Sequence, residues 1–236
     1  MENKYNLIVP MINTSQKYLN KLPIEFQYDN NTGKMNCIKS IENINIDLIT
    51  DIYFVILQSH QDKYNIASKI DTAIYNSPLK HINYTFLFLD HPTSSQAETV
   101  YAAIKKYNIN GSILIKDADN MCVINEPISH NSVLVYNLEN TPIVDPQHKS
   151  YIAIDDQNFI TNIIEKRIIS NLFNCGGYFF ENVEDYVEGY NALLNFEDIN
   201  NHMYISHIIY WLILNKNIKF RPIEAIGYED FEIKER

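Results

Sequence analysis

The sequence predicts an α/β fold in which helices cover both faces of a mixed, mostly parallel sheet. Three observations support this prediction. In the first half of the chain, short apolar runs rich in β-branched and aromatic residues alternate with segments of helical spacing. Such βαβα alternation is typical of parallel sheets joined by right-handed crossovers. One apolar run ends abruptly in two carboxylates, and no repeat, linker or low-complexity block divides the 236 residues. We therefore expect one domain over residues 1–236.

The first half of the chain contains four expected strands and three expected helices. The runs IYFVILQ and YTFLFL have the composition that strands prefer, whereas apolar residues three or four positions apart indicate helices. The polar stretch Thr93-Ser94-Ser95 can cap the third helix. The strands are expected over residues 6–11, 52–58 and 84–89 and from Ile113, and the helices over residues 35–43, 64–74 and 99–107.

The second half is more mixed. The apolar stretch 205–214 is too short to span a bilayer and contains His207, Tyr210 and Trp211, so a core helix is expected there. Strands are expected over residues 132–137, 150–154 and 159–165, and helices over residues 185–194 and 203–215.

The charge balance restricts the partners. The chain has 19 Lys and Arg against 29 Asp and Glu, a formal net charge of -10, whereas surfaces that bind nucleic acid need clustered cations. We expect no nucleic-acid partner and no membrane span. A phosphorylated small molecule stays compatible, because a metal or local cation can reverse the field in one cleft. Three cysteines without CxxC spacing indicate neither a disulfide framework nor a zinc site, which favours a cytoplasmic location. A homo-oligomer is left open.

The apolar run that begins at Ile113 ends in Asp117, Asp119 and Asn120. A run of this kind indicates a buried parallel strand, and open α/β sheets bind ligands at the carboxyl ends of their strands. Alternate residues of a strand face the same way, and oxygen ligands suit Mg²⁺ or Mn²⁺. We expect this pair of carboxylates to hold a divalent cation against phosphates. The bland alternative is a solvated turn.

Two polar loops are expected at the same edge of the sheet. Residues 10–18 (PMINTSQKY) follow the first strand, and their amides together with Lys17 could meet a triphosphate. This loop is not a P-loop, because it lacks the glycines and the GK[ST] ending. Residues 90–99 (DHPTSSQAET) follow the third strand, and the amide of Gln96 could read a base as both donor and acceptor. The alternative for residues 10–18 is a strand-to-helix loop without a ligand, and the alternative for residues 90–99 is only the start of a helix.

The order of these motifs resembles that of nucleotidyltransferase-like families of the GT-A fold, in particular bacterial sugar-phosphate nucleotidyltransferases of capsule and surface polysaccharide synthesis. The resemblance runs along almost the whole chain and implies a single GT-A-like, Rossmann-like domain. Five segments carry it: residues 10–18 in place of a PMAGxGxRF loop, residues 92–99 (PTSSQAET) in place of PTxGQAET, the strand end 116–120 (KDADN), Glu165-Lys166 before residues 176–180 (GGYFF), and residues 228–231 (YEDF) in place of the start of YEDWGT.

The resemblance also implies roles for single positions. Asp119 and Asp230 would be the magnesium carboxylates, with Asp117 shaping the turn or acting through water. A substrate phosphate would attack the α-phosphorus of a nucleoside triphosphate and release pyrophosphate, while the protein supplies positioning and charge neutralisation. The other implied contacts are Pro10, Met11, Asn13, Ser15, Ser94, Ser95 and Gln96 with the nucleotide, Lys17 with the triphosphate, Glu165 and Gly177 with the substrate, and Lys166 with the substrate and its phosphate.

Several positions depart from the family pattern. Asn13 and Ser15 replace glycines, whose lack of a side chain permits close backbone approach, and Lys17 replaces an arginine and its planar fork. Ile24 stands where the family has a phosphate-binding lysine, and residues 232–233 replace the final GT. Metal-dependent nucleotidyl transfer to a sugar phosphate is the leading expectation. A GT-A glycosyltransferase that uses a nucleotide sugar is the alternative, and a catalytically silent nucleotide-binding homologue is the third.

Overall fold

The computed structural model describes residues 4–12, 21–141, 145–196 and 202–232. Strands and helices alternate through the first half of the chain, as predicted. The strands are β1 (Tyr5–Met11), β2 (Ile49–Leu57), β3 (Asn83–Leu89), β4 (Ile113–Lys116), β5 (Asn120–Val123), β6 (Ser132–Asn137), β7 (Ser150–Ile154), β8 (Ile160–Glu165), β9 (Leu172–Phe180), β10 (Arg221–Glu224) and β11 (Gly227–Asp230). The helices are α1 (Asn36–Lys39), α2 (Gln58–Tyr64), α3 (Ile66–Tyr75), α4 (Gln96–Tyr107), α5 (Val183–Leu193) and α7 (Ile205–Lys216).

Nine of these strands form one sheet. Its central path runs in the order β10-β6-β9-β4-β1-β2-β3, and β7 and β8 attach at β9. Pairing is parallel from β4 through β1 and β2 to β3, and again between β6 and β10, whereas β9 runs antiparallel to both β4 and β6. Among the described strands of this path, β9 alone is reversed. The sheet is therefore mixed and mostly parallel, which confirms the predicted fold class.

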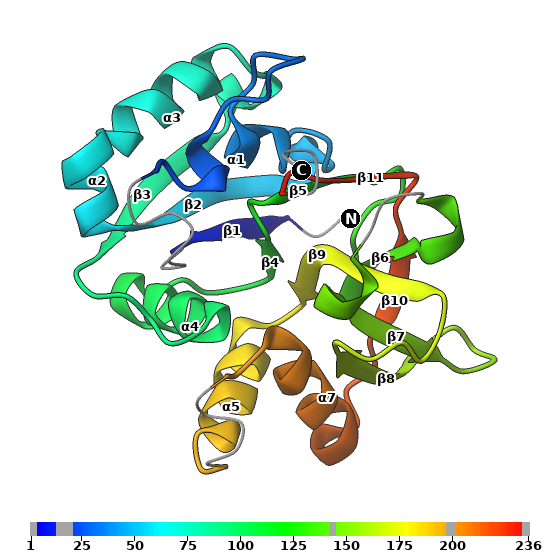
Figure 1. Ribbon diagram of the computed structural model, residues 1–236. Helices are drawn as coiled ribbons and strands as arrows, with labels where there is room; N and C mark the ends of the chain where they lie inside the picture. The colour runs from blue at the N-terminus through cyan, green and yellow to red at the C-terminus, as the bar shows by residue number, and fades with distance from the viewer. Residues whose placement is uncertain (1–3, 13–20, 142–144, 197–201, 233–236) are drawn as a thin grey trace.

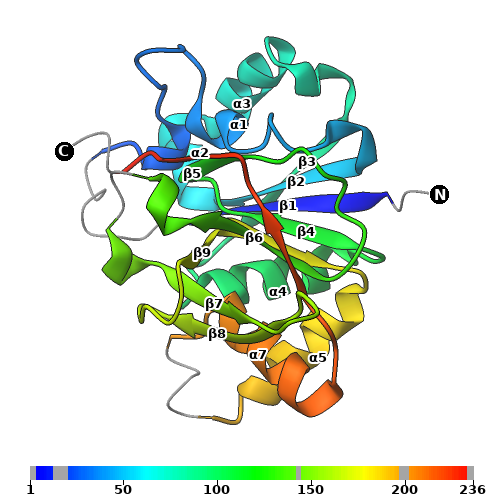
Figure 2. The same cartoon turned by 90° about the vertical axis from the view of Figure 1, so that its right-hand side faces the viewer.

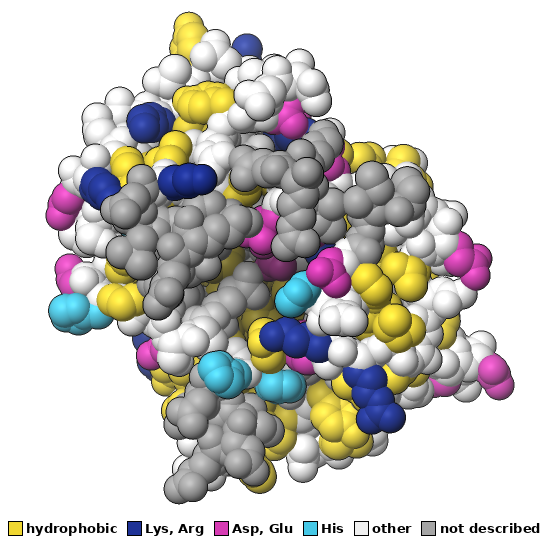
Figure 3. All heavy atoms as spheres, viewed as in Figure 1, with side chains coloured by type: hydrophobic (Ala, Val, Ile, Leu, Met, Phe, Trp, Pro, Cys, Tyr) yellow, Lys and Arg dark blue, Asp and Glu magenta, His cyan; other side chains and the backbone are white. Residues whose placement is uncertain are grey.

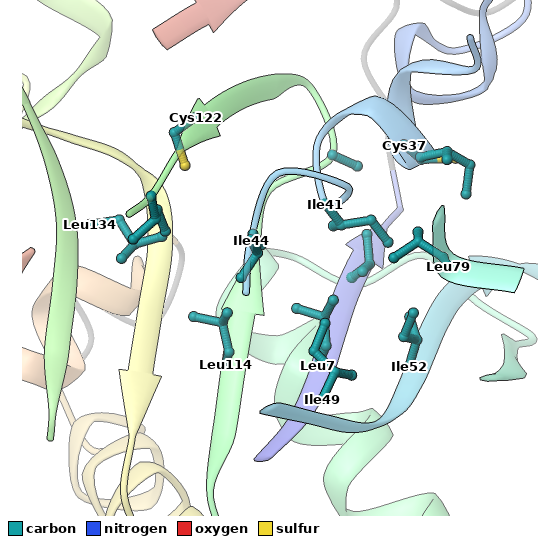
Figure 4. Close-up of a cluster of buried hydrophobic side chains, with 14 of the residues drawn as sticks. Leu7, Cys37, Ile41, Ile44, Ile49, Ile52, Leu79, Leu114, Cys122 and Leu134 are labelled. Atoms are coloured by element: carbon teal, nitrogen blue, oxygen red, sulfur yellow. The ribbon is translucent and has the colours of Figure 1, made fainter. Parts of the chain in front are cut away.

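Helices cover both faces of the sheet (Figure 1 and Figure 2). The helices α4, α5 and α7 lie on one face, and α1, α2 and α3 lie on the other. The alternation of a strand explains this: Leu7 and Val9 of β1 enter the cluster under α1 and α3, while Ile8 enters the cluster under α4, α5 and α7. Figure 4 shows the first of these clusters, in which Leu7, Ile52 and other strand residues meet apolar residues that follow α1.

The structure corrects two predicted helices. The expected helix 35–43 is helical only over Asn36–Lys39, although Ile41 and Ile44 are buried in the core. The spacing of the apolar residues therefore predicted which side chains are buried but not how far the helix extends. The expected helix 64–74 is α3, which begins at Ile66, because Asn65, with a φ of 49° in the left-handed region, separates it from α2, a helix that the sequence did not predict. A residue in that region typically ends a helix.

Four strands were absent from the sequence prediction. The strands β5, β10 and β11 have only four residues each, too few to show a period of two. The strand β9 is buried along most of its length and contains Gly176 and Gly177, so it has neither polar alternation nor strand-like composition throughout. The strands β6 and β7 have the predicted bounds.

The apolar stretch near the end of the chain is a core helix, as predicted. Ile205, Ile208, Ile209 and Leu212 of α7 are buried against the face that α4 and α5 also cover. No helix in the described part of the chain is both long and apolar enough to cross a bilayer.

Candidate functional site

A cavity of about 290 Å³ opens at the carboxyl end of the parallel strands. Its walls come from the loop after β3, the turn after β4, the middle of β9, the residues around β7 and β8, and the start of α7. On the face shown in Figure 3, acidic, basic and histidine side chains gather near the middle of the molecule. The lining residues are Ser94, Ser95, Gln96, Asp117, Asp119, Asn120, His148, Lys149, Ser150, Glu165, Asn174, Gly176, Tyr178, His202, Met203 and Tyr204.

The turn after β4 is held by a buried lysine. The Nζ of Lys116, which is fully buried, donates to the carbonyl of Asp117 at 2.9 Å, to the carbonyl of Asn120 at 3.1 Å and to Oδ1 of Asn120 at 2.8 Å. Nδ2 of Asn120 in turn donates to Oδ1 of Asp119 at 2.9 Å. Three donated bonds satisfy the ammonium of a lysine. Lys116 therefore shapes the turn that presents both carboxylates and does not contact the cavity.

The backbone of β9 supports this turn from below. The amide of Asp117 donates to the carbonyl of Gly176 at 2.8 Å. Gly176 has a φ of 80°, and a Cβ there would lie 2.7 Å from Oδ2 of Asp117 and 2.6 Å from Nδ2 of Asn120. Only glycine fits this position without displacing the Asp117 carboxylate.

The predicted base loop reaches the same cavity. The Oγ of Ser95 accepts from the amide of Glu98, and the amide of Ser94 donates to Oε2 of Glu98 at 2.5 Å, so the loop caps α4 as its sequence predicts. Nε2 of Gln96 donates to Oδ1 of Asp117 at 2.6 Å. Gln96 is thus tied to the carboxylate, a contact that the sequence did not indicate.

The two carboxylates of the turn share one environment. Burial and then the negative charge of Asp119 raise the pKa of Asp117 to about 7, against opposing effects of Lys116, Gln96 and Lys149. A carboxyl with such a pKa is only partly ionised at neutral pH. Perturbed acids of this kind cluster at functional sites.

The end of the chain returns to this turn. The strand β11 pairs antiparallel with β5, so Asp230 lies opposite Asn120, and the amide of Phe231 donates to the carbonyl of Asp119 at 3.0 Å. Oδ2 of Asp230, however, accepts from Nζ of Lys149 at 2.8 Å, and Asp230 is not among the residues that line the cavity. Asp117 and Asp119 do line it. The two carboxylates that border the cavity are therefore Asp117 and Asp119, rather than the expected pair of Asp119 and Asp230.

Of the two predicted substrate residues around the end of β8, Glu165 lines the cavity and Lys166 does not. Oε1 of Glu165 accepts from Oγ of Ser150 at 2.6 Å and from Oγ of the buried Ser206, which aims the carboxylate along the cavity wall. Nζ of Lys166 instead donates to the phenol of Tyr204 at 2.8 Å, and Lys166 does not itself line the cavity.

Three other predicted residues lie away from the cavity lining. Gly177 is buried within β9, where a Cβ would come within 2.1 Å of Cδ1 of Leu134, so its neighbour Gly176 is the glycine that borders the cavity. Pro10 and Met11 end β1, and the side chain of Met11 is in the core. Asn13, Ser15 and Lys17 lie outside the described residues.

The sequence missed about half of the lining. Gly176 and Tyr178 could have been found, because they belong to the GGYFF segment that was noted, and Asn174 lies two residues before it. Lys149 and Ser150 carry no local signal, since they reach the cavity only through the pairing of β7 with β8 and β9. Tyr204 carries none either, because it is brought there by the start of α7. The remaining missed residues are His148, His202 and Met203.

The donor set suits a hard cation that is completed by a ligand. In the described residues, no three His, Cys, Asp or Glu side chains are grouped to hold a metal ion. Asp117 and Asp119 offer two carboxylates at one cavity, and Mg²⁺ typically binds one or two carboxylates, waters and substrate phosphates rather than a full protein cage.

A larger hollow of about 950 Å³ lies among α4, α5 and α7 and contains Trp211. Two of its charged groups, Lys216 and Glu188, pair with each other. The smaller cavity is the better candidate site, because polar groups and a carboxyl with a raised pKa converge there.

Comparison with known proteins shows what this fold is similar to. No family model and no curated protein sequence matches the chain. A nucleoside-diphosphate-sugar pyrophosphorylase from Vibrio cholerae RC9 aligns over 97% of this chain and 96% of its own, with 18% identity and a TM-score of 0.77. The inositol-1-phosphate CTP transferase from T. maritima aligns over 98% and 89%, with 12% identity and a TM-score of 0.71. A UDP-glucose pyrophosphorylase complexed with UDP-glucose aligns over 98% and 95%, with 13% identity and a TM-score of 0.69. The chain therefore has an α/β, Rossmann-like nucleotidyltransferase fold.

Proposed function

We propose that this protein is an enzyme that transfers a nucleotidyl group, with the help of a divalent metal, from a nucleoside triphosphate to a sugar phosphate or a similar small phosphorylated acceptor. The observation that carries the proposal is that Asp117 and Asp119 line one cavity together with the Ser94–Gln96 loop and Glu165. The structural neighbours are named as nucleotide-sugar pyrophosphorylases and a CTP transferase, which supports this choice among the activities a GT-A-like fold can host.

Each wall of the cavity would then have one task. Asp117 and Asp119 would hold Mg²⁺ or Mn²⁺, which when bound would neutralise charge on the nucleotide phosphates. Gln96 would orient Asp117, the loop of Ser94 and Ser95 would contact the base, and Glu165 would accept hydrogen bonds from sugar hydroxyls. Pro10, Met11, Asn13 and Ser15 remain proposed nucleotide contacts, and Asp230 remains a proposed metal ligand.

The reaction would be an in-line displacement. A phosphate oxygen of the acceptor forms a bond to the α-phosphorus, and the bond from that phosphorus to the bridging oxygen of pyrophosphate breaks. The attacking phosphate is already ionised, so no general base is needed. Positioning the two phosphates and neutralising their charge is the main contribution that a protein makes to such a transfer. Lys17 and Lys166 are the cations that the motif order proposes for this task.

We also propose that the product serves capsule or surface polysaccharide synthesis and is made in the cytoplasm. The support is the order of the motifs along the sequence, from the PMINTSQKY loop to the YEDF segment.

A glycosyltransferase that uses a nucleotide sugar is the second candidate, because Asp117 and Asp119 form a DxD pair at the cavity. Such an enzyme needs a metal-held diphosphate but not the contacts to a γ-phosphate that the altered loop 10–18 would have to supply.

The test is release of pyrophosphate. The protein is incubated with each nucleoside triphosphate, Mg²⁺ and a panel of sugar phosphates, and we expect release with at least one pair. The Asp119→Asn variant should lose this activity, and the variant of the exposed turn carboxylate, Asp156→Asn, should retain it. Absence of release with every pair, together with thermal stabilisation by a UDP-sugar, would refute nucleotidyl transfer and leave the glycosyltransferase and the catalytically silent homologue as candidates. Absence of any stabilisation by nucleotides with Mg²⁺ would refute nucleotide binding.

A further inference from the structure

The cavity has an unusual charge balance. Three carboxylates, those of Asp117, Asp119 and Glu165, line it, and among the described lining residues Lys149 is the only lysine or arginine. The ammonium of Lys166 bonds to the phenol of Tyr204. In the part of the chain that the structure describes, Lys149 is therefore the cation best placed to meet an anionic ligand in this cavity.

Lys149 is held firmly by the end of the chain. Its Nζ donates to Oδ2 of Asp230 at 2.8 Å and to the phenol oxygen of Tyr228 at 2.5 Å, both on β11. The side chains of Lys149 and Asp230 are each 14% exposed, and the ammonium also lies 5.1 Å from the centre of the Tyr228 ring. Burial raises the pKa of Tyr228 well above its ordinary range, so this partner stays an uncharged phenol.

This arrangement leaves the lysine with capacity for a ligand. An ammonium has three N–H donors, and the bonds to Asp230 and Tyr228 use two of them. The third can be directed at a phosphate oxygen. A charge whose direction is set before the ligand arrives needs no reorganisation when the ligand binds.

The position of Lys149 indicates which phosphate it meets. Lys149 precedes Ser150 of β7, and Ser150 bonds to Glu165, while the backbone carbonyl of Lys149 accepts from the amide of Lys166 at 2.8 Å. These residues form the β7–β8 wall of the cavity, whereas the Ser94–Gln96 loop that follows β3 forms a separate part of its lining. An anionic acceptor on that wall would approach two carboxylates and a nucleotide phosphate, all of the same sign, so it needs a cation beside it.

We propose that the Nζ of Lys149 binds the phosphate of the acceptor, and that Asp230 and Tyr228 are positioning residues that direct this ammonium. This inference rests on the proposed function, since it names the contact for its second substrate. It gives Asp230 a second role besides the proposed metal binding. The carboxylate that was expected to bind a metal together with Asp119 here accepts a hydrogen bond from Lys149.

The test is phosphate binding, which does not require turnover. Inorganic phosphate and glucose 1-phosphate are titrated into wild type and Lys149→Met by calorimetry, with phosphorus NMR as the second measurement. We expect wild type to bind both ions with a Kd of about 10 mM or lower. For Lys149→Met we expect a Kd about tenfold to a hundredfold higher. Lys149→Arg should recover part of the loss. Lys80→Met, which changes an exposed lysine, is the matched control and should bind as wild type does.

Two further arms separate the outcomes. The Kd of a nucleoside monophosphate with Mg²⁺ should be within about threefold of the wild-type value in Lys149→Met. Weaker nucleotide binding with unchanged phosphate binding would overturn the assignment of Lys149 to the acceptor. Equal phosphate affinity in all variants, or no phosphate binding by wild type, would overturn it as well. The double variant Lys149→Met with Asp230→Asn removes both charges, so its weak phosphate binding in a protein with normal thermal unfolding excludes misfolding as the cause. If Lys149→Met loses phosphate binding but wild type releases no pyrophosphate with any substrate pair, Lys149 is a phosphate-binding residue and the proposed function is refuted.

Discussion

The ionised carboxylate of Asp117 should lower the free energy of unfolding, and replacing Asp117 by asparagine, its uncharged isostere, should restore the lost stability. Asp117→Asn keeps the shape of the side chain and an oxygen that can accept from Nε2 of Gln96. It removes the ionisation that burial and Asp119 oppose. We expect a more stable protein that has lost metal-dependent activity, because functional sites often store such unfavourable charge.

The magnitude follows from the shifted pKa. Each tenfold change in proton affinity is worth about 1.4 kcal/mol, so a rise from 3.8 to about 7 corresponds to at most about 4 kcal/mol. Asp117 borders an open cavity, where water screens part of this cost, and we expect about 1 to 3 kcal/mol. For a chain of this length that corresponds to a rise in Tm of roughly 2 to 10 °C.

The gain should depend on pH. The pKa of Asp117 is raised in the folded state, so between about pH 4 and about pH 7 the folded protein keeps a proton that the unfolded chain has lost. Wild type therefore loses stability as pH rises through this window, and Asp117→Asn does not. The difference between the two should be near zero at pH 4 and complete above pH 7.

The assay is thermal and urea unfolding of both proteins, without metal or nucleotide, at several values of pH from 4 to 8. Asp156→Asn, in an exposed turn, is the control and should follow wild type throughout. The reasoning fails if Asp117→Asn is no more stable than wild type at pH 7.5, or if its advantage is the same at every pH.

Three other perturbations test the fold and the site. The side chain of Lys39 is 7% exposed and bonds to Asp29 at 2.9 Å and Glu229 at 2.7 Å, so Lys39→Met should cost about 3 kcal/mol in urea unfolding by removing the two shielded ion pairs, whereas the control Lys106→Met at an exposed pair should cost less than about 1 kcal/mol; equal losses would argue against this. Gly177→Ala should cost about 1 to 3 kcal/mol because its Cβ would meet Leu134, and Gly227→Ala, with open contact distances, should cost less; a Gly177→Ala protein as stable as wild type would mean that β9 and β6 separate easily. Since no three His, Cys, Asp or Glu side chains in the described residues are grouped to hold a metal ion, EDTA alone should leave Tm unchanged, while EDTA added to protein with nucleotide and Mg²⁺ should lower it; a drop in Tm with EDTA alone would reveal a preformed metal cage.

Part of the site could be predicted because its residues are local in sequence. The carboxylates Asp117 and Asp119 follow an apolar run, and Ser94 to Gln96 precede a helix, so both patterns point to the carboxyl ends of parallel strands. Glu165 was found through its motif. All of these residues line one cavity.

The remainder depends on pairings between distant segments. Lys149 reaches Asp230 across 81 positions, and Lys39 reaches Glu229 across 190, because β11 returns to pair with β5. A four-residue strand carries no periodic signal, so neither ion pair could be predicted. The same pairing explains why Asp230, expected beside a metal, has a lysine as its nearest partner.

The sequence by itself determined the class of the fold, since the period of the apolar residues decides which segments are strands and which faces are buried, and it placed two carboxylates at the end of one strand. The tertiary structure alone decided which groups share their cavity, that Gln96 bonds to Asp117, and that Lys149 rather than Lys166 is the lysine in the lining. The physical reason is range: burial patterns act over a few residues along the chain, whereas the charge and pKa of a site depend on every group that folding brings within a few ångströms.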